Sequence, residues 1–255
     1  MTDIHQLENK MRLLKLNGML DTLDLRLSQA QKDSLGFIQF LEFLLEDEVQ
    51  HRANKGLANR VIKARFEEEK SLEQFDFSFN SRIPSQHIHD LATCRFAEQK
   101  ESIIFCGPVG VGKTHLAQAL GHQACRRGYS VLFTKASRLL SDLGGGRADG
   151  TWDKRLRRYI KPDLLILDDF ALREFTKSQA EDLYELIDQR YRGGSMIVTA
   201  NRSLKDWYSL FPNPVIAESA HDRLISCSHI ITLTGNSYRT LLRPDKALAK
   251  EVVTV

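Results

Sequence analysis

A glycine-rich loop that ends in a lysine and a threonine is the most informative pattern in this sequence. Residues 107–114 read Gly-Pro-Val-Gly-Val-Gly-Lys-Thr, a complete G-x-x-x-x-G-K-[ST] motif. Its glycines let backbone N–H groups turn toward phosphates, its lysine adds a positive charge, and its hydroxyl is a ligand for Mg²⁺. The motif therefore predicts a site for a nucleoside triphosphate, ATP, with Mg²⁺ on Thr114. The candidate nucleotide-binding residues are Gly107, Pro108, Val109, Gly110, Val111, Gly112, Lys113, Thr114 and His115.

Two flanking segments must position this loop. The apolar run 102–106 predicts a buried strand that leads directly into it, and a helix is expected from Lys113 to about Arg127, ending before Gly128. Phosphates held by the loop would lie at the N-terminus of this helix, where the helix dipole favours anions. The alternative is a glycine-rich turn without a ligand, and the strand and helix on either side argue against it.

Two further apolar runs end in polar side chains that could complete the site. The run 164–167 is followed by Asp168 and Asp169, the pattern of a Walker B strand. We expect Asp168 to hold the Mg²⁺ shell and Asp169 to orient the attacking water. A strand expected at 195–200 precedes Asn201, whose amide could hydrogen-bond the γ-phosphate. For both runs the alternative is a polar turn after a strand.

Two arginines follow in the last third of the chain. Arg223 stands in Asp-Arg-Leu near the end of a predicted helix, and Arg239 closes Ser-Tyr-Arg. A planar, permanently charged guanidinium suits the charge on a phosphoryl group in the transition state. Taken alone, either arginine is more often a surface residue.

The elements between these motifs predict an α/β fold. Near-continuous apolar strands alternate with helices, which indicates a parallel sheet covered on both faces. Ligands of such sheets bind beyond the carboxyl ends of the strands, where the motifs above converge. The expected fold class is thus a P-loop parallel sheet flanked by helices and preceded by a small all-helical module. Strands are expected at 102–106, 130–134, 163–168, 195–200 and 229–233.

The sequence divides into four expected segments. Residues 1–70 lack proline and predict a helical module for self-association or partner binding. Residues 71–84 carry phenylalanines with period two, which predicts an extended linker whose aromatic rings dock on the next domain. Residues 85–245 form the expected ATPase domain, and 246–255 a C-terminal tail.

Three helices are expected within the first 70 residues. They cover about 3–30, a segment with its N-cap at Ser34, and about 52–69. The second is apolar on more than one side, so we expect it to pack against two neighbours. An intramolecular bundle without a partner is the alternative to self-association.

Composition bounds the class of protein. With 255 residues, 42% of them hydrophobic and 27% charged, the chain is typical of a soluble globular protein. It has no apolar run of about 18 residues and no signal-peptide pattern at its N-terminus, so we expect a cytoplasmic protein without a membrane partner. The four cysteines form no C-x-x-C motif, which favours reduced thiols. His87 and His89 have no further ligand at metal spacing.

Charge is concentrated in one segment. Residues 138–161 hold seven basic and three acidic residues, although the whole chain carries only +3. Gly144 to Gly146 are expected to form a short hinge in it. If the residues after the hinge are helical, Lys154 lies beside Arg157, and Arg155 beside Arg158. Such a face suits backbone phosphates of duplex DNA and weakly sequence-specific binding; the alternative is a solvated helix face. The candidate DNA-binding residues are Arg138, Arg147, Lys154, Arg155, Arg157 and Arg158.

The order of these motifs resembles that of the AAA+ ATPases of the helicase-loader and initiator group. Within that group it is most similar to the IstB-like helper ATPases of insertion sequences. The stretches 112–117 and 164–170, and Asp-Arg-Leu with the later Ser-Tyr-Arg, carry the resemblance, which extends from about Leu72 to Arg239.

The resemblance implies roles for several of these residues. Asn201 would be sensor 1, Arg223 an arginine finger offered to a neighbouring subunit, and Arg239 a sensor-2 arginine. Segment 138–161 falls where this group carries an extra helix that lines bound DNA. Most AAA+ proteins have Asp-Glu in Walker B, so the shorter Asp169 suggests slow hydrolysis.

The implied function is that of an ATP-dependent DNA-binding helper ATPase of transposition. It would form a homo-oligomer on double-stranded target DNA with ATP and Mg²⁺, and recruit or activate a transposase. A replicative helicase loader with the same ATPase engine is the first alternative. A small-molecule P-loop kinase is the second, and it leaves the trans arginine and the helical module unexplained.

Overall fold

The computed structural model describes residues 4–80 and 82–240 of the chain. The chain forms two compact units, and the boundary between them falls between Asn59 and Arg60. Residues 241–245, expected to end the ATPase domain, and 246–255, expected to form a tail, lie outside the described residues.

The first unit is helical, as the sequence predicts. Met11, Met19, Leu23 and Leu44 form its buried core. The carboxylate of Glu48 accepts hydrogen bonds from the backbone N–H groups of Gly18 at 2.7 Å and Met19 at 3.2 Å. These are orphan donors of a helix N-terminus, so the contact satisfies groups that the helix itself leaves unpaired. Its helices are α1 (Ile4–Leu13), α2 (Asn17–Lys32) and α3 (Phe37–Ala64), which continues past the boundary between the units.

The helix boundaries in this unit differ from those expected. The single helix expected over 3–30 is broken around Lys15, which has a φ of +57°. Ser34 is not an N-cap, because its own φ is +50° and α3 begins only at Phe37. The separate helix expected at 52–69 is the second half of α3, a continuous helix of 28 residues. Helix α3 contains no proline and a single glycine, Gly56, so no residue in this stretch breaks the helix.

The apolar sides of α3 are only partly used within the first unit. Leu44 is buried, but the side chains of Phe37 and Ile38 are 94% and 84% exposed. The expectation that this helix packs against two neighbours is therefore wrong for the N-terminal part of α3 within its own unit.

The second unit contains a five-stranded sheet with the strand order β2-β3-β4-β1-β5. Every neighbouring pair is parallel, which confirms the predicted sheet. Each strand lies within two residues of its expected position. The strands are β1 (Ser102–Cys106), β2 (Val131–Lys135), β3 (Leu164–Phe170), β4 (Ser195–Ala200) and β5 (Ser228–Thr232).

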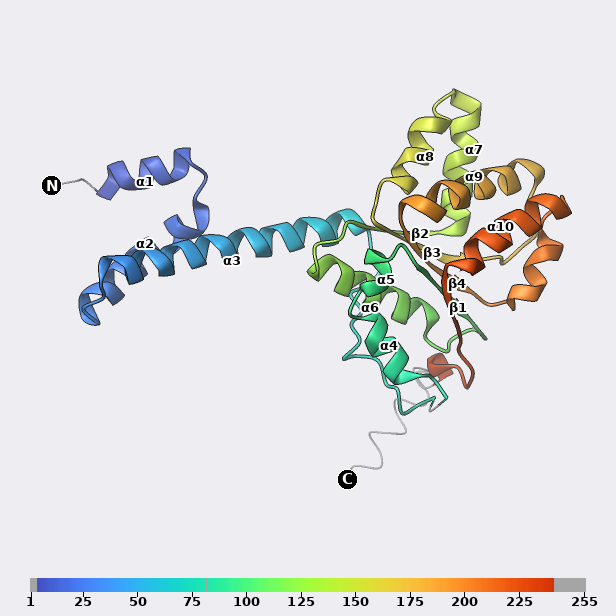
Figure 1. Cartoon of the computed structure of the whole chain (residues 1–255), viewed down its shortest axis with the longest axis horizontal. Coiled ribbons are helices and arrows are strands. Elements are labelled where there is room, and N and C mark those ends of the chain that lie inside the picture. The colour runs from blue at the N-terminus through green and yellow to red at the C-terminus, as the bar shows by residue number, and fades with distance from the viewer. Residues whose placement is uncertain (1–3, 81, 241–255) are drawn as a thin grey trace. The chain divides into compact units, whose positions relative to one another are not determined.

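Helices cover both faces of this sheet (Figure 1). On one face, Gly121 of α6 comes close to Ile166 of β3. On the other, alternate strand residues such as Ile104 and Leu165 pack with α7, α8, α9 and α10 in one buried core. Successive residues of a strand point to opposite faces of the sheet. Because helices cover both faces, residues on both sides are apolar, and each strand appears in the sequence as a continuous apolar run. The helices are α4 (Ser85–Leu91), α5 (Arg95–Glu98), α6 (Lys113–Arg126), α7 (Ala136–Asp149), α8 (Trp152–Ile160), α9 (Lys177–Gly193) and α10 (Pro214–Ser226), with 3₁₀ helices η1 (Leu204–Leu210) and η2 (Tyr238–Thr240).

Two of these helices start at strong local signals. Thr176 and Gln179 form a reciprocal capping box at the start of α9. The side chain of Asn213 accepts from Val215 N–H at 2.9 Å, and Pro214 occupies the first turn of α10. Both helices therefore begin where the sequence supplies partners for their free N–H groups.

Residues 71–80 and 82–84 form turns and bends, and are not extended as expected. The carboxylate of Asp76 accepts from the backbone N–H of Ser78 at 2.9 Å, a local turn contact. The expected docking of its aromatic rings is confirmed: Phe75 lies 5.2 Å from His115 and Phe79 lies 5.0 Å from Tyr238, measured between ring centroids.

Three general properties complete the fold. Across the described ranges, no helix has both the length and the apolar character that a membrane crossing needs. Within those same ranges, no group of three or more His, Cys, Asp or Glu side chains could hold a metal ion. The four cysteines are free thiols, and burial raises the pKa of Cys94, Cys106 and Cys125 to about 11.

Candidate nucleotide-binding site and basic helix

The glycine-rich loop connects β1 to α6, as predicted. Gly110 and Gly112 have φ angles of +82° and +103°, a region that side chains rarely adopt. A Cβ atom on Gly110 would lie 2.0 Å from Ser237 Oγ, and one on Gly112 would lie 2.5 Å from Phe75. The loop is thus closely surrounded, and only glycine fits at these two positions.

Lys113 begins α6 and folds back over the loop. Its ammonium group donates to the carbonyl oxygens of Gly107 at 2.8 Å and Pro108 at 2.6 Å. Burial lowers the pKa of Lys113, while the carboxylates of Asp169 and Asp168 oppose the shift. An ammonium has three donors, so one remains beyond the two that hold the loop.

Thr114, the next residue of α6, is joined to the end of β3. Its hydroxyl donates to Asp168 Oδ1 at 2.8 Å, and the Thr199 hydroxyl of β4 donates to the same oxygen at 2.6 Å. Asp168 is buried; burial raises the pKa of its carboxyl, and the two hydroxyls oppose the rise. A hydroxyl beside a carboxylate is an oxygen-ligand set that suits Mg²⁺, so these residues fit the predicted metal role.

Asp169 takes an unusual backbone conformation. Its φ is +55°, and the pairing of β3 with β4 shifts register between Leu167 and Phe170. The backbone N–H of Asp169 donates to the Thr199 hydroxyl at 3.1 Å. A non-glycine residue in this region costs on the order of 1–3 kcal/mol. This conformation interrupts the alternation of the strand at the point where Asp168 contacts Thr114 and Asp169 lines the nucleotide cavity.

One cavity of about 350 Å³ collects most of the predicted nucleotide site. Gly107 and Pro108 do not line the cavity, but their carbonyl oxygens accept from the ammonium group of Lys113, which does. Asp168 does not line it either, but it is hydrogen-bonded to Thr114, which does. The predicted residues that line the cavity are Val109, Gly110, Val111, Gly112, Lys113, Thr114, His115, Asp169, Asn201 and Arg239.

His115 lies against the segment that precedes the sheet. Its Nε2 is 2.8 Å from the carbonyl oxygen of Ser71, and burial lowers the pKa of the imidazole. The ring therefore forms part of the cavity lining beside Phe75.

Sequence reasoning missed several residues of this cavity. Asn80 bonds both backbone groups of Asn236, accepting from its N–H at 3.0 Å and donating to its carbonyl at 3.1 Å. Tyr238 N–H donates to the carbonyl of Gly110 at 2.9 Å. Together these bonds hold the segment that carries Arg239 against the loop. Thr199 was also missed as a partner of Asp168, although a hydroxyl at the end of a neighbouring parallel strand is a signal that could have found it.

Arg223 does not lie in this cavity. It lines a separate open cavity of about 670 Å³, where α9 and α10 face each other. The structure therefore brings together the loop, Asp168, Asp169, Asn201 and Arg239, and keeps Arg223 apart from them within one chain.

The predicted basic segment forms a helical hairpin, α7 and α8. Gly144 to Gly146 lie inside α7, so the expected hinge is wrong. A Cβ atom on Gly146 would lie 2.9 Å from the Cα of Trp152 and from Arg155 Cδ. Gly146 therefore lets α8 pack closely on α7, whereas a Cβ atom on Gly144 would meet nothing within 4 Å. Close packing is a reason for glycine that a sequence pattern does not reveal.

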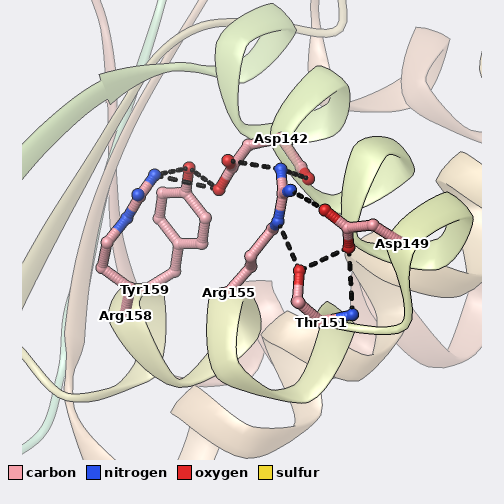
Figure 2. Close-up of polar contacts among 6 residues, drawn as sticks. All are labelled: Asp142, Asp149, Thr151, Arg155, Arg158 and Tyr159. Atoms are coloured by element: carbon pink, nitrogen blue, oxygen red, sulfur yellow. Dashed lines mark hydrogen bonds and ion pairs between the residues drawn. The ribbon is translucent and has the colours of Figure 1, made fainter.

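Most candidate DNA-binding arginines form ion pairs within the chain itself. Figure 2 shows the guanidinium of Arg155 between Asp142 and Asp149, and Arg158 on the other oxygen of Asp142. Arg155 Nη1 is 3.1 Å and Arg158 Nη2 is 2.9 Å from the Asp142 carboxylate. Arg158 also donates to the Tyr159 hydroxyl at 2.7 Å, and burial raises the pKa of this phenol to about 12.

The other four candidates divide into two pairs. Arg138 lies 3.2 Å from Glu67, and Arg147 lies 2.7 Å from Asp182. Lys154 and Arg157 are exposed on α8, and no ion pair involves either of them within 4–80 and 82–240. They lie three residues apart, so they share one face of the helix.

Helix α8 is fixed at both ends to α9. The indole N–H of Trp152 donates to Asp182 at 2.8 Å. At the other end, buried Arg190 donates to the carbonyl oxygens of Tyr159 at 2.9 Å and Ile160 at 3.0 Å, which lack partners within the helix.

Known proteins share this combination of fold and motifs. The family model described as IstB-like ATP-binding protein matches residues 9–245. An insertion-sequence ATP-binding protein of Mycobacterium tuberculosis is 52% identical over 241 residues, covering 94% of this chain and 96% of that protein. The ATP-binding protein of insertion sequence IS21 from Pseudomonas aeruginosa is 34% identical over 236 residues, covering 92% and 89%.

Solved structures share the fold at lower sequence identity. The DnaC helicase loader superposes with a TM-score of 0.54 at 22% identity, over 67% of this chain and 97% of that one. AMPPCP-bound DnaA from Aquifex aeolicus superposes with a TM-score of 0.57 at 19% identity, over 74% and 56%. These likenesses confirm the predicted AAA+ fold. With the family match and the curated relatives, they lead to one conclusion: the chain belongs to the family of IstB-like ATP-binding proteins.

Proposed function

We propose that this protein is a DNA-binding ATPase of transposition, which assembles on double-stranded target DNA with ATP and recruits or activates a transposase. The observation that carries the proposal is one cavity lined by Lys113, Thr114, Asp169 and Asn201, with Arg223 outside it. The names of its relatives, ATP-binding proteins of insertion sequences, support the transposition context.

The residues of the cavity suit ATP and Mg²⁺. Backbone N–H groups at the start of α6, together with the remaining donor of Lys113, would hold the phosphates. Thr114 and Asp168, already joined through a 2.8 Å hydrogen bond, would hold the metal. Mg²⁺, when bound, neutralises the charge that develops on the phosphates.

Hydrolysis would depend on two further residues in the same cavity. Asp169 is the candidate for orienting the attacking water, and Asn201 for hydrogen-bonding the γ-phosphate. An aspartate reaches less far than the glutamate usual in AAA+ proteins, so we expect slow turnover, with ATP serving as an assembly switch.

Arg223 would act on the nucleotide of a neighbouring subunit. It lies in a cavity apart from the nucleotide site of its own subunit. A homo-oligomer in which each subunit supplies this arginine to the next would explain that separation. Arg239 lines the nucleotide cavity and would act in cis.

DNA binding would use the basic α7–α8 hairpin. Lys154 and Arg157 are the strongest candidates, because both are exposed and neither has an ion pair among the described residues. Arg138, Arg147, Arg155 and Arg158 would contribute where their carboxylate partners leave donors free.

A partner-capture experiment tests this proposal. Full-length protein with ATP and Mg²⁺ is bound to immobilised duplex DNA and offered the transposase of its own element or, separately, the replicative helicase of its host. We expect ATP-dependent retention of the transposase, and none with Lys113→Ala protein. Retention of the helicase alone would instead favour the helicase-loader function.

A further inference from the structure

Arg223 is held in a defined orientation by two residues of the neighbouring helix. Its Nε is 2.8 Å from Asp188 Oδ1, and its Cζ lies 5.1 Å from the centroid of the Tyr184 ring. Tyr184 and Asp188 are four residues apart on α9, so they present one ring and one carboxylate on the same face of that helix. A third contact, from Nη1 to the carbonyl oxygen of Ser219 at 3.2 Å, comes from its own helix, α10.

These contacts use only part of the guanidinium. A guanidinium has five N–H donors; Asp188 forms an ion pair on the Nε side, and the carbonyl oxygen of Ser219 accepts one of the two N–H groups on Nη1. Nη2 has no partner within residues 4–80 and 82–240, and the side chain of Arg223 is 31% exposed. The edge that carries Nη1 and Nη2 therefore keeps free donors in the fork geometry that binds two oxygens of a phosphate.

The surroundings of this edge are open. The cavity beside it, of about 670 Å³, is also lined by Tyr208 and Glu218 and lies apart from the nucleotide cavity of the same subunit. An arginine that lines an open cavity apart from the nucleotide cavity of its own chain is suited to a charge brought by a second molecule.

We infer that Asp188 and Tyr184 are positioning residues for Arg223. They orient its guanidinium so that the Nη edge meets the triphosphate bound by a second copy of this chain. This inference rests on the proposed function, in which Arg223 acts in trans. Asp188 orients the guanidinium and does not block it, because the ion pair lies at Nε and leaves the Nη edge free to meet a phosphate.

The expected effect follows from how sensitive such contacts are to position. An arginine finger contributes about 10³–10⁵ in rate, and a misplacement of about 1 Å can cost about 10². Asp188→Ala keeps Arg223 but removes the ion pair that fixes its orientation. We therefore expect this variant to lower the trans-stimulated ATPase rate by roughly 10- to 100-fold. Asp188→Asn keeps a polar side chain of the same size beside Nε but removes its charge, and should retain more of the rate than Asp188→Ala does.

Mixed oligomers test the inference. A subunit with Lys113→Ala lacks tight ATP binding but still offers Arg223, and a subunit with Arg223→Ala binds ATP but offers no finger. Mixing the two should restore part of the ATPase. Adding Asp188→Ala to the Lys113→Ala subunit should then lower this restored rate by roughly 10- to 100-fold.

The matched control places the same substitution in the other subunit. Asp188→Ala added to the Arg223→Ala subunit has no guanidinium to orient, so the restored rate should stay unchanged. Glu185→Ala in the finger-donating subunit removes a carboxylate of α9 whose one hydrogen bond among the described residues comes from Gln189 at 2.9 Å, and should also have no effect. ATP binding and the circular dichroism spectrum of each variant establish that it is folded.

Each result decides something. An equal loss with Asp188→Ala in either subunit would mean a general structural role and overturn the inference. An unchanged or raised rate with Asp188→Ala in the finger-donating subunit would also overturn it, the raised rate pointing to restraint of Arg223. If the parental mixture restores no activity, the trans role of Arg223 in the proposed function is itself wrong, and the inference falls with it.

Discussion

The two pairs of basic residues on α8 should differ in their effect on DNA binding. Arg155 forms ion pairs with Asp142 and Asp149, and Arg158 forms one with Asp142. Lys154 and Arg157 are exposed, and neither forms an ion pair among the described residues. The perturbation compares two double variants: Lys154→Ala with Arg157→Ala, and Arg155→Ala with Arg158→Ala. Only the first should remove cations that neutralise DNA phosphates directly.

The magnitude follows from the number of ions released. Each phosphate contact contributes about −0.9 to the slope of log affinity against log salt concentration for duplex DNA. Loss of both Lys154 and Arg157 should flatten the slope by about 1.8. Between 50 and 200 mM salt, the affinity of the parent should then fall roughly tenfold more than that of the variant. The Arg155 and Arg158 variant should bind more weakly at every salt concentration, with a slope that changes by less than about 0.9.

Fluorescence anisotropy with a labelled duplex provides the measurement. Affinity is determined at several salt concentrations between about 50 and 200 mM, with saturating nucleotide and on two unrelated sequences, which should behave alike because phosphates carry no base information. A Lys177→Ala, Lys205→Ala protein controls for the loss of two exposed positive charges elsewhere. Equal flattening by the two α8 variants, or flattening by the Arg155 and Arg158 variant alone, would refute the reasoning that ion pairing withdraws these arginines from DNA.

Three further predictions concern the nucleotide site and the helical unit. Lys113→Ala should weaken ATP binding by roughly 10- to 100-fold, because a charge-assisted hydrogen bond is lost; a titration with fluorescent nucleotide measures this, and undiminished binding would argue against the site. Asp169→Asn should still bind ATP but hydrolyse it about 10²- to 10⁴-fold more slowly, and an unchanged steady-state rate would show that Asp169 does not orient the water. Glu48→Gln should lower the melting temperature at pH 7. Burial opposes ionisation of Glu48, but Arg52 and two backbone N–H groups outweigh it and lower the pKa of the carboxyl. That stabilisation is present above the ordinary glutamate pKa and is lost as the pH falls through the lowered one. Circular dichroism melts should therefore show the difference narrowing below about pH 4, and a constant difference would contradict the assigned cause.

The nucleotide site could be predicted largely from sequence because its geometry is local. A loop, the strand before it and the helix after it are continuous in the chain, and parallel strands end at one edge of the sheet. The same local signals predicted Asp168, Asp169 and Asn201 at that edge. The bond between Asn80 and Asn236 could not be predicted, because it joins residues 156 positions apart and no pattern marks either of them.

The basic segment shows a second limit. Gly144 to Gly146 resemble a flexible hinge, yet they lie inside α7, and α8 packs against Gly146. Arg155 and Arg158 were predicted to share a helix face, and they do, but that face meets the carboxylate of Asp142 on α7. Periodicity gives the direction of a side chain around its own helix; what lies opposite depends on tertiary packing.

Helix α9 contacts both the basic helix α8 and Arg223 of α10. Its Asp182 and Arg190 hold the two ends of α8, and its Asp188 holds Arg223. The helix has 17 residues, or about 25 Å at 1.5 Å per residue, and it joins these contacts without a break. On the proposed function, a curved duplex that displaced α8 would therefore act on the same helix that orients Arg223. The shape of the bound DNA would then change ATP turnover at a second copy of the chain, while the nucleotide cavity keeps its own arrangement.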